Sequence, residues 1–258
     1  MDFYPDVSVL PRARYLQLVT SLRLLDPAII RSNEPEEVLT FSYQEPLQER
    51  FIIPWRKVKA KLRRIVAERG RDLGYGTMCF LKESLCMTCP TCLLFGGTGE
   101  TSTAKAGYNL LSRVMGETFI SKAKNIEPVG YTANAVGEVK HTTGQALMTL
   151  ITVPADTEFI GVVTLKDPTP EMASLLVDGI KRLTRIGARS VEWGRCRMDI
   201  LGGGIFDHEV YSAYELLRDG GLEDIPALEM ELPPIEKAFE KLQDQISELI
   251  LQIQKSGD

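Results

Sequence analysis

Apolar and polar side chains alternate along residues 14–25, and this two-residue period predicts a half-buried strand. The spacing changes over residues 55–69, where apolar side chains recur every three or four positions and Gly70 follows them. That period predicts an amphipathic helix that ends near the glycine. Between the two elements, residues 26–50 are acidic and contain three prolines, so we expect an exposed loop with a short strand at residues 38–41.

The helix predicted for residues 55–69 is apolar on one side and strongly basic on the other. Its apolar stripe consists of Val58, Leu62, Ile65 and Val66. Helical periodicity then places its basic residues on the flanks and the outer face of the helix. These residues are Arg56, Lys57, Lys59, Lys61, Arg63 and Arg64.

The second half of the chain contains two apolar, β-branched runs, at residues 146–153 and 158–165, which are separated by turn residues at 154–157. This arrangement predicts a hairpin. Two prolines then precede a predicted helix that ends near Gly187. A last strand is predicted for residues 190–201 and is expected to end at the glycine triplet that follows it.

In chain order, the predicted elements are strand, helix, strand, strand, helix and strand. This order predicts an α+β fold with a ferredoxin-like (RRM-like) βαββαβ core. We assign residues 1–71 and 145–204 to this discontinuous core. Residues 72–144 form a cysteine-rich, metal-binding insertion, and residues 205–258 form an acidic C-terminal helical segment.

The end of the chain has apolar residues at alternating steps of four and three, which is the spacing of a helix that packs against another helix. We expect its partner to be the body of the same chain, and a neighbouring subunit is the alternative. The residues of this seam are Ile235, Phe239, Leu242, Ile246, Leu249 and Ile253.

The chain is acidic overall, with a formal net charge of -5, which argues against a free-standing nucleic-acid-binding protein. The basic residues are nevertheless concentrated, because residues 56–71 contain eight of them with one acidic residue. Residues 181–197 contain six basic residues with one acidic residue, whereas residues 205–258 contain thirteen acidic and four basic residues. Such a distribution can hold a polyanion on one face, although either basic stretch alone is equally consistent with a solvated helix surface.

Four of the five cysteines, Cys79, Cys86, Cys89 and Cys92, lie within fourteen residues. Thiolates at such spacings can close on one metal ion, so we predict a structural Zn2+ site, with a cysteine-ligated iron–sulfur cluster as the main alternative. Disulfides are disfavoured because the sequence shows no secretory or membrane-spanning pattern, which indicates a cytoplasmic protein. Cys196 stands alone and is expected to be a small core residue.

Three further patterns point only weakly to catalysis. The glycine-rich residues 95–99 lack the Gly-Lys-Ser/Thr ending of a phosphate loop, so we reject nucleotide hydrolysis. His141 has no nucleophile motif near it and is better explained as a polar contact in a loop. The carboxylates of Glu34, Glu36 and Glu37 could bind a divalent ion but more often form a solvated turn.

Four short motifs occur in order along the chain. They are FIIPWRKVKAKLR at residues 51–63, CMTCPTCLLFG at 86–96, HTTGQA at 141–146 with VPADTEF at 153–159, and IGARSVEWGR at 186–195. Together they resemble the IPGSSLKGKLR, CxxCxLFG, RxTGxA...VPxGTxF and IGGxxxxGxGR elements of the repeat-associated mysterious protein superfamily of CRISPR systems. Within that superfamily, residues 141–169 are most similar to the guide-RNA-binding backbone subunit of type I-D interference complexes.

The resemblance implies that several copies of the chain line one CRISPR RNA, together with other CRISPR effector subunits. These copies present the guide to a target nucleic acid, with DNA favoured over RNA. A thumb-like hairpin within residues 128–144 is implied to interrupt the guide–target duplex at regular steps. The implied role is structural and not catalytic.

The resemblance also carries guide contact to individual positions, namely Arg56, Lys57, Lys59, Lys61, Arg63, His141, Thr143 and Gly144. Two positions depart from the family pattern. His141 replaces the usual arginine, and Arg56 and Lys57 stand where the family often has small hydroxyl residues. Independently of the resemblance, a helix N-terminus with Lys57 and Lys59 beside it suits a phosphate group.

Three alternatives stay open. The first is a metal-dependent nuclease that cuts the target strand at regular intervals. Some related backbone subunits do so with an aspartate on the loop before the first helix, where this chain has Asn33 and glutamates but no aspartate after Asp26. The second alternative is a guide-processing endoribonuclease that depends on His141. The third is a zinc-stabilised assembly protein that does not contact RNA.

Overall fold

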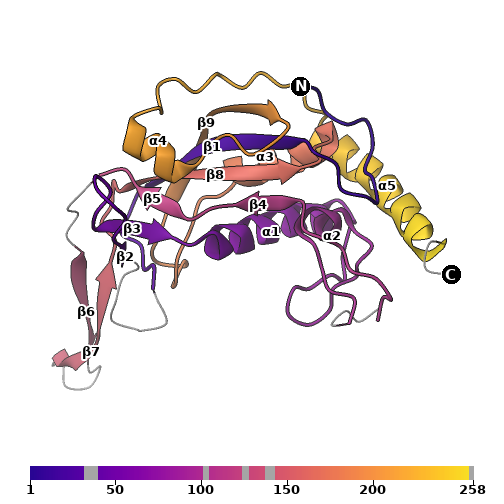
Figure 1. Ribbon diagram of the computed structural model, residues 1–258. Coiled ribbons are helices and arrows are strands. Elements are labelled where there is room, and N and C mark those ends of the chain that lie inside the picture. Colours follow the sequence, from indigo (N-terminus) through magenta and orange to yellow (C-terminus); the bar gives the residue numbers. More distant parts are fainter. Residues whose placement is uncertain (32–39, 101–104, 124–127, 137–142, 256–258) are drawn as a thin grey trace.

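The computed structural model describes residues 1–31, 40–100, 105–123, 128–136 and 143–255. Within these residues the chain forms an α+β fold around an antiparallel sheet (Figure 1). The strands follow the order β2-β3-β5-β8-β1-β9, and the short strand β4 also pairs with β8. Their bounds are β1 (Tyr15–Leu24), β2 (Thr40–Phe41), β3 (Arg50–Ile53), β4 (Val114–Gly116), β5 (Phe119–Ser121), β8 (Glu158–Lys166) and β9 (Cys196–Phe206).

Helices cover both faces of this sheet. Leu16 and Leu22 of β1 join Leu62 of α1 (Trp55–Asp72) and Leu176 of α3 (Pro170–Lys181) in one buried cluster. On the opposite face, Val19 packs with residues of α4 (Ala213–Asp219). The strand predicted for residues 14–25 is therefore confirmed, but it is buried on both faces instead of one.

The polar residues of β1 explain this difference, because their hydrogen bonds are made inside the protein. Thr20 donates its hydroxyl hydrogen to the carbonyl of Gly161 at 2.8 Å. Gln17 accepts hydrogen bonds from the backbone amides of Val210 and Tyr211. A polar side chain whose hydrogen bonds are satisfied can be buried at little cost, so the alternation in the sequence did not reveal that the polar face of this strand is also buried.

The hairpin predicted for residues 146–153 and 158–165 is wrong. Strand β7 (Thr143–Thr152) pairs with β6 (Val129–Val136) in a separate two-stranded sheet, whereas β8 pairs with β1, β4 and β5. The connecting segment bonds to the end of β1, where Leu24 donates to the Thr157 carbonyl and Asp156 donates to the Leu24 carbonyl, each at 2.9 Å. At this segment the chain passes from the β6–β7 pair into the main sheet (Figure 1).

The glycine triplet lies inside the last strand and does not end it. Strand β9 runs from Cys196 through the glycines to Phe206. A Cβ atom at Gly203, which has φ of +153°, would lie 2.0 Å from the Gln17 carbonyl oxygen, and one at Gly202 would lie 2.4 Å from that of Pro226. Glycine is therefore required for close backbone approach here, and the predicted strand end is corrected.

The C-terminal helix α5 (Ile235–Lys255) packs against its own chain, as the sequence favoured. It contacts α3 and the short α2 (Pro90–Phe95), and it buries Phe239, Leu242, Ile246 and Leu249. Helix α3 ends at Lys181, earlier than the predicted end near Gly187, and the buried residues Leu183 and Ile186 that follow belong to a loop. A residue can be apolar and buried without being helical, which is why periodicity overran the helix end.

Strands β4 and β5 lie within residues 72–144, the range that the sequence assigned to an insertion, yet both pair with β8. Part of that range therefore belongs to the main sheet. In the described part of the chain, no helix is both long and apolar enough to cross a membrane.

Candidate metal centre and nucleic-acid interface

The four clustered cysteines lie together beside the N-terminus of α2. Their sulfur atoms all lie within 4.8 Å of one another, and those of Cys79 and Cys92 are 3.4 Å apart. A Zn–S bond of about 2.3 Å in a tetrahedron requires S–S distances of about 3.8 Å. The thiol donor set and its spacing therefore fit one tetrahedral metal ion.

The local sequence explains how the sulfurs meet. Cys89 is the N-cap of α2 and Cys92 lies in its first turn, so both side chains lie on one side of the helix start. Cys79 lies next to a tight turn at Gly76, which has φ of +61°, and a Cβ atom there would lie 3.1 Å from the Cys89 sulfur. Glycine at this position lets the loop close over the cluster.

The four thiols affect one another's ionisation. Hydrogen bonds from Cys79, Cys89 and Cys92 lower the pKa of Cys86. Hydrogen bonds with the other three thiols instead raise the pKa of Cys89, and those with Cys79 and Cys86 raise the pKa of Cys92. The pKa of Cys79 is also lowered, to about 7, so two thiolates are stabilised at the expense of the other two. A cation bound among the sulfurs would favour the ionised form of all four.

Arg63 belongs to this centre and not to the exposed face of α1. The residue is 9% exposed, and its Nη1 donates to the carbonyl oxygen of Gly96 at 2.7 Å. Its Nη2 lies 3.9 Å from the sulfur of Cys92. The prediction that Arg63 lies on a flank or the outer face is therefore wrong, because the Cys-rich segment covers that side of the helix.

The remaining basic residues at the start of α1 do lie on an accessible surface. Arg56 and Arg64 are exposed, whereas Lys57, Lys59 and Lys61 are half-buried. Partial burial, with the charge of a neighbouring arginine as a second cause, lowers the pKa of each of the three lysines. These five cations define what we call the α1 basic surface.

Two lysines of the α1 basic surface are held by hydroxyl groups. The Nζ of Lys59 donates to Ser112 Oγ at 2.8 Å, and that of Lys61 donates to Ser190 Oγ at 3.2 Å. In the part of the chain with described coordinates, no ion pair involves the five cations of this surface. Their positive charge therefore remains available for an external anion.

The Lys61–Ser190 contact brings the second basic stretch beside the first. Ser190 lies in a loop, residues 182–195, that we call the basic loop. Arg189 and Arg195 of this loop are exposed to solvent. In the same loop, the ring of Trp193 packs on Tyr131 of β6, with the ring centroids 4.7 Å apart.

The sequence did not identify Ser112, Ser190, Trp193 or Tyr131 as site residues. Ser190 and Trp193 lie inside the motif at residues 186–195, but the sequence gave neither residue a role, and no motif contains Ser112 or Tyr131. Each of the four reaches the basic surface through contacts between distant segments.

Other predicted site residues are described in part or not at all. Thr143 and Gly144 lie at the start of β7, where Thr143 is paired with Val136 of β6. His141 lies outside the described residues. Asn33, Glu34, Glu36 and Glu37 do so as well. Both enzymatic alternatives rest on these undescribed positions.

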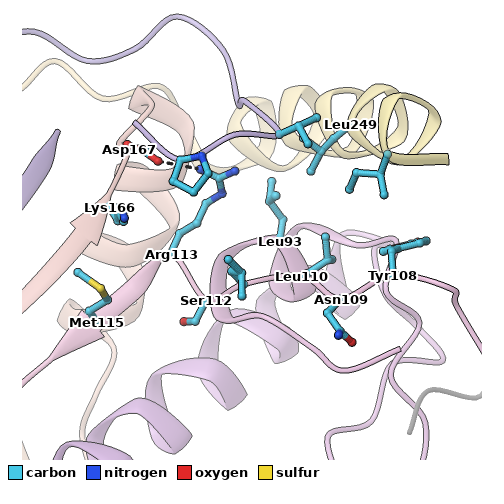
Figure 2. Close-up of a pocket in the computed structure, with 14 residues that line it drawn as sticks. Leu93, Tyr108, Asn109, Leu110, Ser112, Arg113, Met115, Lys166, Asp167 and Leu249 are labelled. Atoms are coloured by element: carbon cyan, nitrogen blue, oxygen red, sulfur yellow. Dashed lines mark ion pairs between the residues drawn. The ribbon is translucent and has the colours of Figure 1, made fainter. Parts of the chain in front are cut away.

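A cavity of about 580 Å3 lies between α2, β4 and α5 (Figure 2). Leu93, Leu110 and Leu249 supply apolar side chains to its lining. At one end, Arg113 Nη1 lies 3.8 Å from Asp167 Oδ2, the ion pair that is dashed in Figure 2. Ser112, which accepts the hydrogen bond from Lys59, also lines this cavity, so the cavity adjoins the α1 basic surface at that residue. The leucine side chains in its lining suit apolar contact.

Comparison with known proteins places these features in a family. The family model described as Csc2 Crispr matches residues 2–255. A crystal structure of Csc2 from Thermofilum pendens is similar, with a TM-score of 0.59 and 22% sequence identity, and the match covers 93% of this chain and 78% of that chain. A chain of a type IV-B CRISPR complex has a TM-score of 0.54 and 12% identity, over 86% of this chain and 96% of that chain. The search of curated proteins found no match.

Proposed function

Because the chain belongs to the Csc2 family of CRISPR proteins, we propose that it is a guide-RNA-binding backbone subunit of a type I-D effector complex. Several copies line one CRISPR RNA and assemble with other effector subunits. The bound guide then pairs with the target nucleic acid, with DNA favoured over RNA. In this proposal the subunit holds and orders the guide and has no catalytic role.

The observation that carries this proposal is the α1 basic surface joined to the basic loop. Five cations that make no ion pair in the described structure lie next to a second basic segment, and Lys61 links the two. Such an arrangement suits a polyanion that crosses both elements. Contacts of this kind reach the phosphate backbone and not the bases, so they are independent of sequence, as a protein that carries many different guides requires.

The start of α1 adds to the same surface. Pro54 is the N-cap, no side chain caps the helix, and the first turn contains no acidic residue. Arg56 and Lys57 lie in that turn although cations are unfavourable at the positive end of a helix dipole. A phosphate group at this position would remove that unfavourable interaction and accept hydrogen bonds from the helix amides.

We further propose that the core is ferredoxin-like. The sheet contains the order β5-β8-β1-β9, so the first and third core strands are central and the second and fourth flank them. The crossover helices α1 and α3 share one buried cluster. In this proposal β4 and β5 together supply the second core strand, and the β6–β7 hairpin is the thumb.

The Cys79, Cys86, Cys89 and Cys92 centre is proposed to bind a structural zinc ion. Four protein thiolates complete a tetrahedral coordination shell and leave no open position for a substrate. Three of the four cysteines are buried, which suits a site that stabilises a loop. An iron–sulfur cluster with the same ligands is the alternative.

The proposal is tested by co-expressing the chain with a CRISPR array and its processing enzyme. RNA that elutes with the protein from a sizing column is then sequenced. A uniform guide in a high-mass peak is the expected result. A wild-type protein that elutes as a monomer without RNA, although the processed guide is present, would contradict the proposal.

A matched pair of variants identifies the surface. We expect Lys57→Gln, Lys59→Gln and Lys61→Gln together to abolish guide retention. For a single-stranded RNA, each lost phosphate contact reduces the steepness of log K for RNA binding against log salt concentration by about 0.7. Three lost contacts in the triple variant should therefore reduce this slope by roughly 2. The control replaces the exposed residues Lys82, Lys237 and Lys255 by glutamine, with the same change in net charge.

A further inference from the structure

Two aromatic rings meet where the β6–β7 hairpin joins the body of the protein. The centroids of Tyr131 and Trp193 are 4.7 Å apart, and their planes are tilted by 60°. Tyr131 is 36% exposed and Trp193 is half-buried. The pair therefore presents aromatic surface to solvent between the hairpin and the basic loop.

The basic loop holds Trp193 in place through its backbone. The Trp193 amide donates to the Arg189 carbonyl at 3.0 Å, and the Ile186 amide donates to the Gly194 carbonyl at 2.8 Å. Gly194, with φ of +76°, donates in turn to the Pro27 carbonyl at 2.9 Å. A Cβ atom at Gly194 would lie 1.9 Å from the Ile186 carbonyl oxygen, so only glycine fits. The backbone that carries the indole is thus held in place, which reduces the conformational entropy that is lost when a ligand binds.

The surroundings of the pair are cationic. Arg189 and Arg195 of the same loop are exposed, and Ser190 accepts the hydrogen bond from Lys61 of the α1 basic surface. Among the described residues, neither Trp193 Nε1 nor Arg185 Nη1 has a hydrogen-bond acceptor, although both atoms are buried. Both N–H groups are covered by the protein, so it is the exposed cations Arg189 and Arg195 that can attract an anionic ligand.

We propose that Tyr131 and Trp193 form a stacking platform for an unpaired nucleobase of a bound single-stranded RNA. This inference rests on the proposed function and adds a base-contacting site to the phosphate contacts of the α1 basic surface. Aromatic side chains beside a cationic track are a common way to bind single strands, because every base offers a π face. The cations favour a nucleic acid over an apolar protein partner at this position.

Tryptophan fluorescence provides a direct test in the 258-residue chain. The protein has two tryptophans, Trp55 and Trp193, so Trp55→Phe leaves Trp193 as the only fluorescent reporter. Phenylalanine keeps an aromatic ring at position 55, where the ring of Trp55 packs against Gly116 of β4. We expect a 12-nucleotide oligouridine to quench this fluorescence. An abasic ribose-phosphate strand of the same length should bind through its phosphates and cause little quenching. Equal quenching by both strands would overturn the platform.

Affinity measurements with variants supply the second readout. Trp193→Ala is expected to weaken oligouridine binding roughly 5- to 150-fold, because a base–aromatic stack contributes about 1–3 kcal/mol. Trp193→Phe should restore most of the loss. Val191→Ala is the matched control, since Val191 is in the same loop and 94% exposed but has no ring. Circular dichroism verifies that each variant is folded.

The outcomes separate this inference from the proposed function. If Trp193→Ala binds as well as wild type while the triple lysine variant does not, the platform is wrong and the proposed function stands. If the wild-type chain binds neither strand, both are wrong. If fluorescence changes with protein concentration and not with RNA, the pair is a contact between protein copies and the inference fails.

Discussion

The side-chain nitrogen of Lys61 on α1 lies 3.2 Å from the hydroxyl of Ser190 in the basic loop, although the two residues are 129 positions apart. This contact joins the two basic stretches of the sequence on one surface. The charge of Arg185 in the same loop also contributes to lowering the pKa of Lys61, after partial burial and the charge of Arg64. The positive charges of Arg64 and Arg185 therefore disfavour the protonated form of Lys61.

Ser190→Glu should weaken RNA binding. The new carboxylate would pair with Lys61 and repel phosphate groups, and we expect a loss of affinity on the order of 3- to 10-fold, measured by filter binding at low salt. Ser247→Glu, at an exposed position of α5, is the control with the same change in charge. Equal affinity of the Ser190→Glu and Ser247→Glu variants would show that RNA does not cross this contact.

Cys89→Ser should remove the bound metal. Because Cys89 is one of four clustered thiols, the metal content per chain should fall towards zero, and the melting temperature should fall with it. Cys196→Ser is the control, since Cys196 is buried outside the cluster and burial raises its pKa to about 12. Zinc analysis and visible absorbance together distinguish zinc from an iron–sulfur cluster. Metal retained at wild-type stoichiometry would contradict the site.

Arg63→Leu should reduce stability without weakening RNA binding by the folded protein. The change removes hydrogen bonds to the carbonyl groups of Phe95 and Gly96, and we expect a cost of about 1–3 kcal/mol in urea unfolding. Arg64→Leu is the matched variant on the exposed side of α1. It should change stability little and lower RNA affinity. The opposite pattern would place Arg63, and not Arg64, at the RNA surface.

Glu117 should make stability depend on pH. Burial raises the pKa of Glu117, even though its carboxylate accepts hydrogen bonds from the Ala213 amide and Ser212 hydroxyl at the start of α4. At pH values between the pKa of Glu117 in the unfolded state and its pKa in the folded state, the folded state binds more protons. The contribution of protonated Glu117 to the free energy of unfolding is therefore complete below the unfolded-state pKa. It is lost as the pH rises through the folded-state pKa. Glu117→Gln should remove that decline in the free energy of unfolding, measured by urea unfolding as the pH is raised above 4.5, the usual pKa of a glutamate. An unchanged pH profile would contradict the assignment.

Much of the fold followed from local patterns. The apolar stripe of Val58, Leu62 and Val66 predicted α1, and these three side chains are buried. The cysteine spacing predicted a cluster, and the four sulfurs do meet. Both predictions succeeded because the relevant side chains are neighbours along one short segment, where chain geometry limits the arrangements.

Pairing between distant segments was harder to predict. Residues 146–153 and 158–165 have the composition of adjacent strands, yet β7 and β8 belong to different sheets. The same limit applies to Arg63, whose position in the helix gave no indication that the Cys-rich segment would bury it. Periodicity specifies which residues are apolar, but not which partner covers them.

By itself the sequence determined the amphipathic helices, the four-thiol cluster, the concentration of positive charge in two stretches and the family resemblance. Only the tertiary structure decided that these two stretches meet at Lys61 and Ser190, and that Tyr131 and Trp193 lie beside them. The physical reason is that local periodicity and charge are properties of neighbouring residues, whereas a contact across 129 positions depends on how the whole sheet and its helices pack.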